Sequence, residues 1–335
     1  MSDRRHAASR MAPACFLAIA LAASAPGIAR AEDWLVLPFA NRSAEPALDW
    51  LGDGFSISIE EQLRAGGQDT VAYDDARSTL FEWRVPRGRA TTLASALKAA
   101  ERFGAVRVIT GHFEVQDGEI QVQARVLDPL EPSVAGELNE RAKLGNLLDL
   151  HARLGRALWN AAREGMPKFR PADKSPEPPP LAAYEQYVRA RIENDPAERL
   201  TKLRLAGHSF PTYSLLQYRL AEALRDAGRP QEALRILEGL HATRFLLSAD
   251  AQALEAALHL ERGAAPEAEQ AIRRSLDLRE SASGRLLRAE ILLALERPDE
   301  AREEIERSRK LGAPEEECEA LARRVAAQAR EAAEN

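Results

Sequence analysis

The chain has 335 residues, 45% of them hydrophobic and 29% charged, with a formal net charge of −6. This composition leaves room for two ordinary domains and is neither that of a disordered chain nor that of a membrane-embedded one. Its acidic balance argues against nucleic acid and anionic lipid as partners, because both carry charge of the same sign.

The first 31 residues are typical of a secretory signal peptide. Three arginines among the first ten residues are followed by a short apolar core at 16–25 and a small-x-small cleavage site at 29–31. The apolar run is shorter than the roughly 20 residues of a membrane span, and no later segment is long enough either. We therefore expect an exported mature chain that starts at Glu32, lacks a transmembrane segment and carries a net charge of −9.

The cysteines indicate no disulfide and no nucleophile. Cys15 would leave with the signal peptide, so Cys318 would remain alone. Three glutamates at 315–317 precede it and disfavour a thiolate. We interpret Cys318 as a passive helix residue.

Residues 32–165 alternate strand-like and helix-like patterns, which predicts a small α/β domain. Asp117-Gly118 is a strong hairpin signal between its last two strands. The predicted strands are 34–39, 70–73, 106–114 and 120–127, and the predicted helices are 48–65, 93–103 and 144–163.

Residues 166–180 hold six prolines in fifteen positions. Each proline removes a backbone donor and fixes its own φ, so this density predicts a semi-rigid spacer. Recognition of the PxxP type is the alternative.

Residues 181–335 repeat themselves. GRPQEA at 228–233, GAAPEA at 263–268 and ERPDEA at 296–301 align with steps of 35 and 33 residues, and an apolar residue follows four positions after each alanine. This period predicts stacked helical hairpins at 214–247, 248–281 and 282–314. A degenerate hairpin at 181–206 precedes them, and a helix from 315 to about 333 would cap the open end. The predicted fold class is therefore a small α/β domain with a mixed sheet, a Pro-rich linker and a C-terminal helical solenoid.

The repeat columns resemble the tetratricopeptide family, which places small residues where the two helices of a hairpin meet. Ala233, Ala268 and Ala301 match this pattern, whereas Glu296 stands where glycine is usual. The resemblance implies a protein-binding solenoid whose first helices line a groove. Its inward register would include, as candidate partner-binding residues, Leu215, Tyr218, Glu222, Arg225, Leu260, Leu286 and Glu290, with Ala253, Ala257 and Leu293 beside them.

The N-terminal domain resembles the TolB amino-terminal-like family. The matching pieces are WLVLPFANRS at 34–43, LDWLGDGFSISIEEQL at 48–63, FGAVRVITGHFE at 103–114 and IQVQARVLD at 120–128. The resemblance implies an α/β domain of a periplasmic or envelope protein that contacts other proteins, and it carries no catalytic constellation.

No segment supplies a recognisable catalytic, cofactor or metal motif. Gly52-Asp53-Gly54 fails the dinucleotide pattern and is interpreted as capping and close packing. Asp49 with Asp53 and Asp74 with Asp75 are interpreted as helix-entry acids. The five histidines after residue 31 are scattered singly, with no metal-ligand spacing.

The sequence therefore predicts a non-catalytic periplasmic or envelope adaptor without cofactors, which binds a protein or peptide partner through its solenoid and α/β domain. Two alternatives stay open. One is an envelope small-ligand sensor or enzyme that uses the α/β domain, which a cofactor-sized pocket with converging polar groups would favour. The other is a subunit of an outer-membrane or surface-structure assembly.

Overall fold

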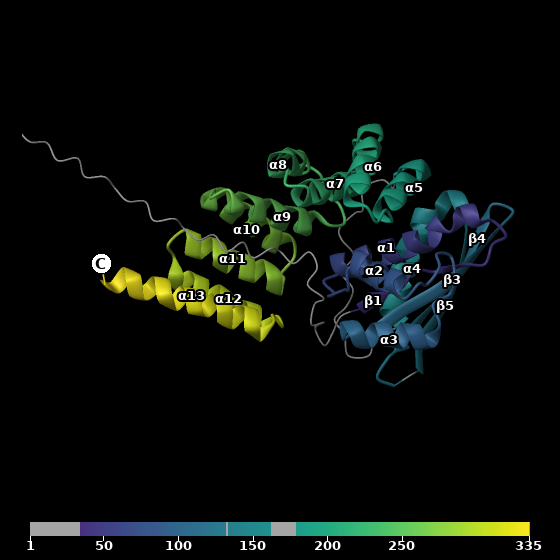
Figure 1. Ribbon diagram of the computed structural model, residues 1–335, viewed down its shortest axis with the longest axis horizontal. Helices are drawn as coiled ribbons and strands as arrows, with labels where there is room; N and C mark the ends of the chain where they lie inside the picture. Colours follow the sequence, from purple (N-terminus) through teal and green to yellow (C-terminus); the bar gives the residue numbers. More distant parts are fainter. Residues whose placement is uncertain (1–33, 132, 162–178, 335) are drawn as a thin grey trace, which may run out of the picture.

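The structure is a computed structural model that describes residues 34–131, 133–161 and 179–334. An α/β unit spans residues 34–161, and a helical-repeat unit spans residues 179–334 (Figure 1). The predicted fold class, a small α/β domain with a mixed sheet followed by a helical solenoid, is confirmed. The predicted signal peptide at 1–31 lies outside the described residues, as does most of the predicted spacer at 166–180.

The α/β unit contains one mixed sheet. Its strands are β1 (Trp34–Val36), β2 (Ala40–Asn41), β3 (Arg107–Gln116), β4 (Glu119–Asp128) and β5 (Ser133–Lys143). The order is β1-β3-β4-β5, with β2 also beside β3. β1 and β2 run parallel to β3, and the later pairs are antiparallel. Asp117 and Gly118 both have positive φ, 53° and 76°, which is the turn geometry predicted for this hairpin.

The alternation of side chains along the strands creates two core faces. Trp34 and Val36 belong to the core that α1 and α4 cover, whereas Leu35 and Leu37 belong to the core beneath α2 and α3. The helices of this unit are η1 (Pro46–Leu48), α1 (Trp50–Ala65), α2 (Tyr73–Glu82), α3 (Leu93–Phe103), η2 (Leu144–Asn146) and α4 (Leu147–Ala161). The three predicted helices are therefore confirmed.

Strands β2 and β5 and helix α2 were not predicted, and one predicted strand is wrong. The predicted strand at 70–73 is only a single parallel bridge between Thr70 and Trp34, because α2 begins at Tyr73. α2 carries Asp74 and Asp75 in its first turn, where acids offset the helix dipole, so their predicted helix-entry role is confirmed. Edge strand β5 is almost entirely exposed or half-buried, and its polar composition gave no strand signal.

The helical-repeat unit contains four helical hairpins and a final helix. The predicted hairpins and the degenerate pair before them are confirmed. Their helices are α5 (Leu181–Arg191) with α6 (Pro196–Ser209), α7 (Ser214–Asp226) with α8 (Pro230–Gly239), α9 (Ser248–Glu261) with α10 (Ala265–Leu278), and α11 (Ala282–Ala294) with α12 (Pro298–Lys310). The aligned alanines Ala233, Ala268 and Ala301 are fully buried.

In each of the three hairpins from α7 to α12, the turn between the two helices requires one residue in the left-handed region. Gly228 and Gly263 occupy it with φ of 70° and 75°, and Glu296 occupies it with φ of 59°. The amide of the next residue then bonds back into the preceding helix, as Arg297 does to the carbonyl of Leu292. Glutamate at this position carries a backbone strain that glycine does not.

The last helix, α13 (Glu315–Glu334), packs along α11 and α12 and caps the stack, as predicted. Cys318 is fully buried there, next to Ile305 and Leu321. Its sulfur lies 3.5 Å from the hydroxyl of Ser308. Cys318 is therefore part of the capping core, as the passive interpretation requires.

Candidate functional site

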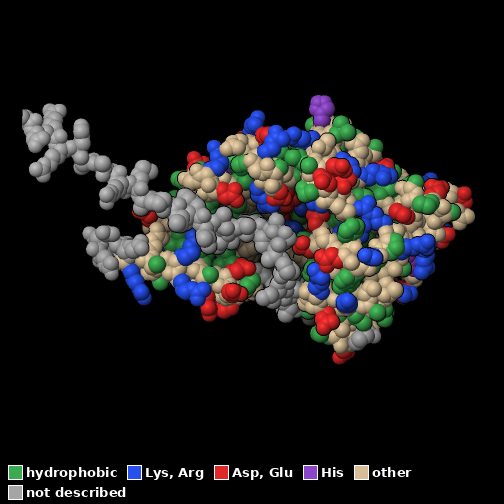
Figure 2. Space-filling model, viewed as in Figure 1, with side chains coloured by type: hydrophobic (Ala, Val, Ile, Leu, Met, Phe, Trp, Pro, Cys, Tyr) green, Lys and Arg blue, Asp and Glu red, His purple; other side chains and the backbone are tan. Residues whose placement is uncertain are grey.

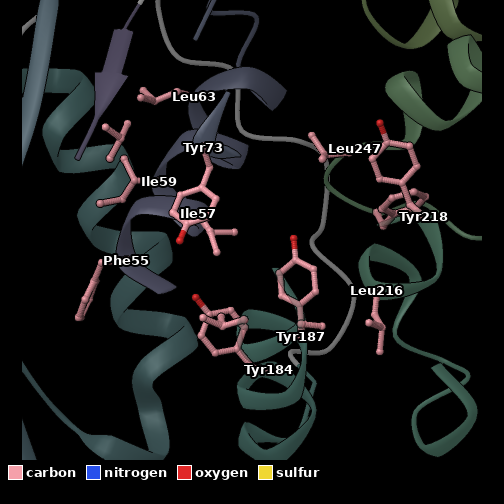
Figure 3. Close-up of a cluster of buried hydrophobic side chains, with 14 of the residues drawn as sticks. Phe55, Ile57, Ile59, Leu63, Tyr73, Tyr184, Tyr187, Leu216, Tyr218 and Leu247 are labelled. Atoms are coloured by element: carbon pink, nitrogen blue, oxygen red, sulfur yellow. The ribbon is translucent and has the colours of Figure 1, made fainter. Parts of the chain in front are cut away.

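Helix α1 of the α/β unit lies against the first helices of successive hairpins. Tyr184 and Tyr187 extend from α5 toward α1 (Figure 3). The hydroxyl of Tyr184 donates to the carbonyl of Gly54 at 2.7 Å, and the hydroxyl of Tyr187 donates to the carboxylate of Glu61. All four residues are buried, so the two units share one continuous core here.

Ion pairs with buried carboxylates extend this contact from α5 to α9. Glu61 accepts from Arg219 of α7, with Nη2 and Oε1 2.8 Å apart, and both side chains are almost fully buried. Arg64 at the end of α1 binds Asp250 of α9 at 3.0 Å. Arg279, after α10, donates both to Asp250 and to the carbonyl of Arg64, each at 2.9 Å. We call this contact of α1 with α5, α7 and α9 the α1 seam.

The α1 seam explains where the predicted groove residues lie. Tyr218 is 2% exposed, its hydroxyl donates to Glu222, and its ring packs against Phe245. Glu222 also binds Arg219 at 2.8 Å. Leu215 is half-buried against the same core, and Arg225 pairs with its neighbour Asp226.

The predicted residues of the later repeats are also engaged within the chain. Leu286 is 9% exposed beneath α13, and Glu290 pairs with Arg324 of α13 at 3.0 Å. Leu260 is half-buried and packs against the core of the α9–α10 hairpin. The structure therefore does not bring the seven predicted residues together along one open groove. Tyr218 and Leu286 are core residues: Tyr218 packs against Phe245 within the repeats, and Leu286 packs beneath α13.

A deep cleft opens beside the α1 seam, where the two units face each other. Its volume is about 1170 Å³, and its walls come from α2, the following loop at 83–92, α5 and α6. Two large apolar side chains line it from opposite units: Phe81 of α2 is 63% exposed and Leu205 of α6 is 68% exposed. Val85 and Ile192 add half-buried apolar surface.

The cleft lining carries more positive than negative charge. Its ionisable side chains are Arg77, Arg84, Arg87, Arg189, Lys202, Glu82 and Glu193. Lys202 pairs with Glu193 and lowers the pKa of that carboxyl to about 2 through a hydrogen bond. Arg77 lies 3.7 Å from the buried Asp53. Arg87 donates to the carbonyl of Ile192 at 2.5 Å, which links the loop to the end of α5.

Arg84 differs from these cations. Within the described residues its side chain has no hydrogen bond or ion pair, and it is exposed at the cleft wall. Its φ is 57°, and the amide of Val85 bonds back to the carbonyl of Leu80, which is the helix-ending geometry in which glycine is usual. The chain therefore accepts backbone strain to place an arginine at this point of the cleft.

The cleft residues were not predicted from the sequence, although one signal was present. RVPRGR at 84–89 places three arginines in six residues of an acidic chain. Phe81 lies just before this run, in a helix that is otherwise mostly polar. An exposed aromatic beside a basic loop is a feature of binding surfaces, but a contact with α5 and α6 about a hundred residues later leaves no trace in the local pattern.

The other candidate chemistry of the sequence is accounted for by packing. A Cβ at Gly52 would lie 2.0 Å from the carbonyl oxygen of Phe39, so close packing at this glycine, as interpreted, is confirmed. Asp53 accepts from the hydroxyl of Tyr73 at 2.8 Å, and burial raises the pKa of its carboxyl. His151 is buried between Phe55 and Tyr184, and burial lowers the pKa of its imidazole to about 3.

Among the described residues no three His, Cys, Asp or Glu side chains come together as metal ligands would. In the same part of the chain, no helix combines the length and apolar character needed to cross a bilayer.

Comparisons with known proteins return similarity only at the level of structure. No protein-family model and no curated protein matches the chain. A crystal structure of MamA is 14% identical; the matched region covers 44% of this chain and 97% of the MamA chain, with a TM-score of 0.36. The LpoB C-terminal domain from Salmonella enterica is 13% identical, with coverages of 35% and 86% and a TM-score of 0.26. Lipoprotein GNA1162 from Neisseria meningitidis is 17% identical, with coverages of 38% and 96% and a TM-score of 0.31. The fold assignment therefore rests on the chain's own helices and strands.

Proposed function

We propose that this protein is a non-catalytic adaptor of a bacterial periplasm or cell envelope that binds a protein partner in the cleft between its two units. One observation carries the proposal. Phe81 and Leu205, two of the most exposed large hydrophobic side chains of the described residues, lie in the same cleft although 124 positions separate them in the chain. Exposed apolar groups gathered in a concavity are typical of interaction sites, whereas scattered ones are ordinary.

The sequence supports the cellular setting of this proposal. The signal-peptide pattern at 1–31 favours export, and the resemblances of the two units to the TolB amino-terminal-like and tetratricopeptide families favour a protein-binding role in the envelope. The described residues that line the cleft include neither histidine nor cysteine, and their acids are Glu82, which pairs with Arg102, and Glu193, which pairs with Lys202. This lining suits recognition better than acid-base or nucleophilic catalysis.

Site-specific photo-crosslinking in living cells tests the binding function. A benzoylphenylalanine that replaces Phe81 should form an adduct with one partner in the periplasmic fraction. The matched position is Leu130, which is 81% exposed in the turn after β4 and lies outside the cleft lining. Adducts from position 130 but not from position 81, or adducts from neither position, would contradict the proposed function.

The cleft volume favours a small-ligand sensor as a second candidate. About 1170 Å³ lies just above the usual range of roughly 300 to 1,000 Å³ for ligand pockets, and its cations would suit an anion. Thermal unfolding with a panel of small anionic metabolites distinguishes the two functions. A ligand-induced rise in Tm that Arg84→Glu abolishes, together with no adduct at position 81, would favour the sensor.

A further inference from the structure

The charge of the cleft opposes that of the chain. The whole chain has a net charge of −6, and positive and negative side chains are interspersed over the face drawn in Figure 2. The described residues of the cleft lining instead include five cations and two carboxylates. A local positive field in an acidic protein attracts anionic groups.

Most of these cations already have partners, which narrows what a ligand can use. Arg189 pairs with Glu185 at 2.8 Å and Lys202 pairs with Glu193. Arg84 alone among the five has neither a hydrogen bond nor an ion pair within the described residues, and its guanidinium is exposed. A carboxylate that enters the cleft can therefore form a charge-assisted, two-pronged contact with Arg84 without breaking an existing pair.

The apolar side chains add a second requirement. Phe81 and Leu205 face the cleft from α2 and α6, and each leaves more than half of its side chain exposed. Covering them requires bulky apolar groups from the ligand, because burial of apolar area supplies most of the affinity of such contacts. A small polar anion would satisfy Arg84 but leave both apolar walls in water.

The chain's own remaining segments do not fit this description. In the mature chain only Glu32 and Asp33 precede β1, too short a segment to present two bulky apolar side chains. Residues 162–178 carry one more basic than acidic side chain, so charge complementarity favours a separate partner over that segment.

We infer that the cleft binds an acidic peptide segment of a partner protein that presents at least two bulky apolar side chains, with a carboxylate on Arg84 and the apolar groups on Phe81 and Leu205. This inference rests on the proposed binding function and specifies the chemistry of the partner at the same site.

Selection from a random twelve-residue peptide display library on the full mature chain tests the inference. Selected peptides should carry net negative charge and at least two residues from Phe, Leu, Ile, Met and Trp. Their affinities for purified protein are then measured by fluorescence anisotropy. Arg84→Glu should raise Kd roughly tenfold or more, since it replaces an attractive charge contact by a repulsive one. Leu205→Gln should raise Kd by a similar factor.

Matched controls lie outside the cleft. Arg244 is exposed, and within the described residues it has no ion pair, so Arg244→Glu makes the same charge change elsewhere. Leu130→Gln matches Leu205→Gln. Both controls should leave Kd within about twofold. Peptides that are basic or neutral yet lose binding in Leu205→Gln would overturn the inference while leaving the binding function intact. Failure to select any cleft-dependent peptide, together with no adduct at position 81, would overturn both.

Discussion

The two units of this protein meet in two ways. Along the α1 seam the ion-paired carboxylates are buried and each has an arginine partner, as in the contact between Glu61 and Arg219. In the cleft beside the seam, the same two units leave Phe81, Leu205 and Arg84 exposed. The first contact fixes the relative position of the units. The second uses that fixed position to hold a binding site that neither unit has alone.

Breaking the seam should have the largest effect. Arg219→Ala leaves Glu61 as a buried charge without its cation, and this should lower the free energy of unfolding by about 3 to 5 kcal/mol. Urea denaturation followed by circular dichroism measures it. Arg244→Ala, at an exposed position, should change stability by less than about 0.5 kcal/mol. A loss below about 1 kcal/mol for Arg219→Ala would mean that the seam is not the main contact between the units.

Acid should lower the free energy of unfolding through His151 of α4, whose ring contacts Phe55 of α1 and Tyr184 of α5. Burial holds the pKa of its imidazole at about 3, whereas the unfolded chain binds a proton at about 6.5. The unfolded state therefore gains protons first as pH falls below 6.5, and stability is lost over that window. Between pH 7 and pH 5 this group should lower the free energy of unfolding by about 2 kcal/mol. His151→Phe keeps an aromatic ring beside Phe55 and Tyr184 and should remove this loss of stability between pH 7 and pH 5. Urea denaturation at the two pH values measures it, and an equal loss in the variant and the natural protein would contradict the assignment.

Two strained turns sharpen the comparison by separating stability from binding. Arg84 in the cleft and Glu296 between α11 and α12 both have positive φ, 57° and 59°. Replacement of either by glycine should raise the free energy of unfolding by about 1 kcal/mol, since glycine relieves the left-handed strain. Arg84→Gly alone should weaken binding of the selected acidic peptides. Equal loss of peptide binding in Glu296→Gly would show that the effect is not local to the cleft.

Predictions from sequence succeeded where the signal is periodic. The 33- to 35-residue repeat fixes the hairpins because each must bury the same face, and the buried Ala233, Ala268 and Ala301 follow from it. The alternation of apolar residues likewise predicts strands β3 and β4. Strand β5 was not predicted because an exposed edge strand needs few apolar residues, and α2 was not predicted because its apolar positions are sparse.

The seam and the cleft were beyond sequence reasoning for a different reason. Glu61 and Arg219 lie 158 positions apart, and each looks like an ordinary charged helix residue on its own. The family register assigns Tyr218 to a partner's groove, but its ring is buried against Phe245, and the adjacent Arg219 binds Glu61 of α1. Contacts between units depend on how the units dock, and no local pattern encodes docking.

Amide hydrogen exchange of the full mature chain, with and without a selected acidic peptide at saturating concentration, tests the central claim most directly. We expect slower exchange in residues 81–87 and 189–205, which form the cleft walls, and no change in β5 or in α9 to α12. Slower exchange confined to the helices of the repeats beyond α8, with the cleft walls unchanged, would contradict the account and place the binding surface on the solenoid.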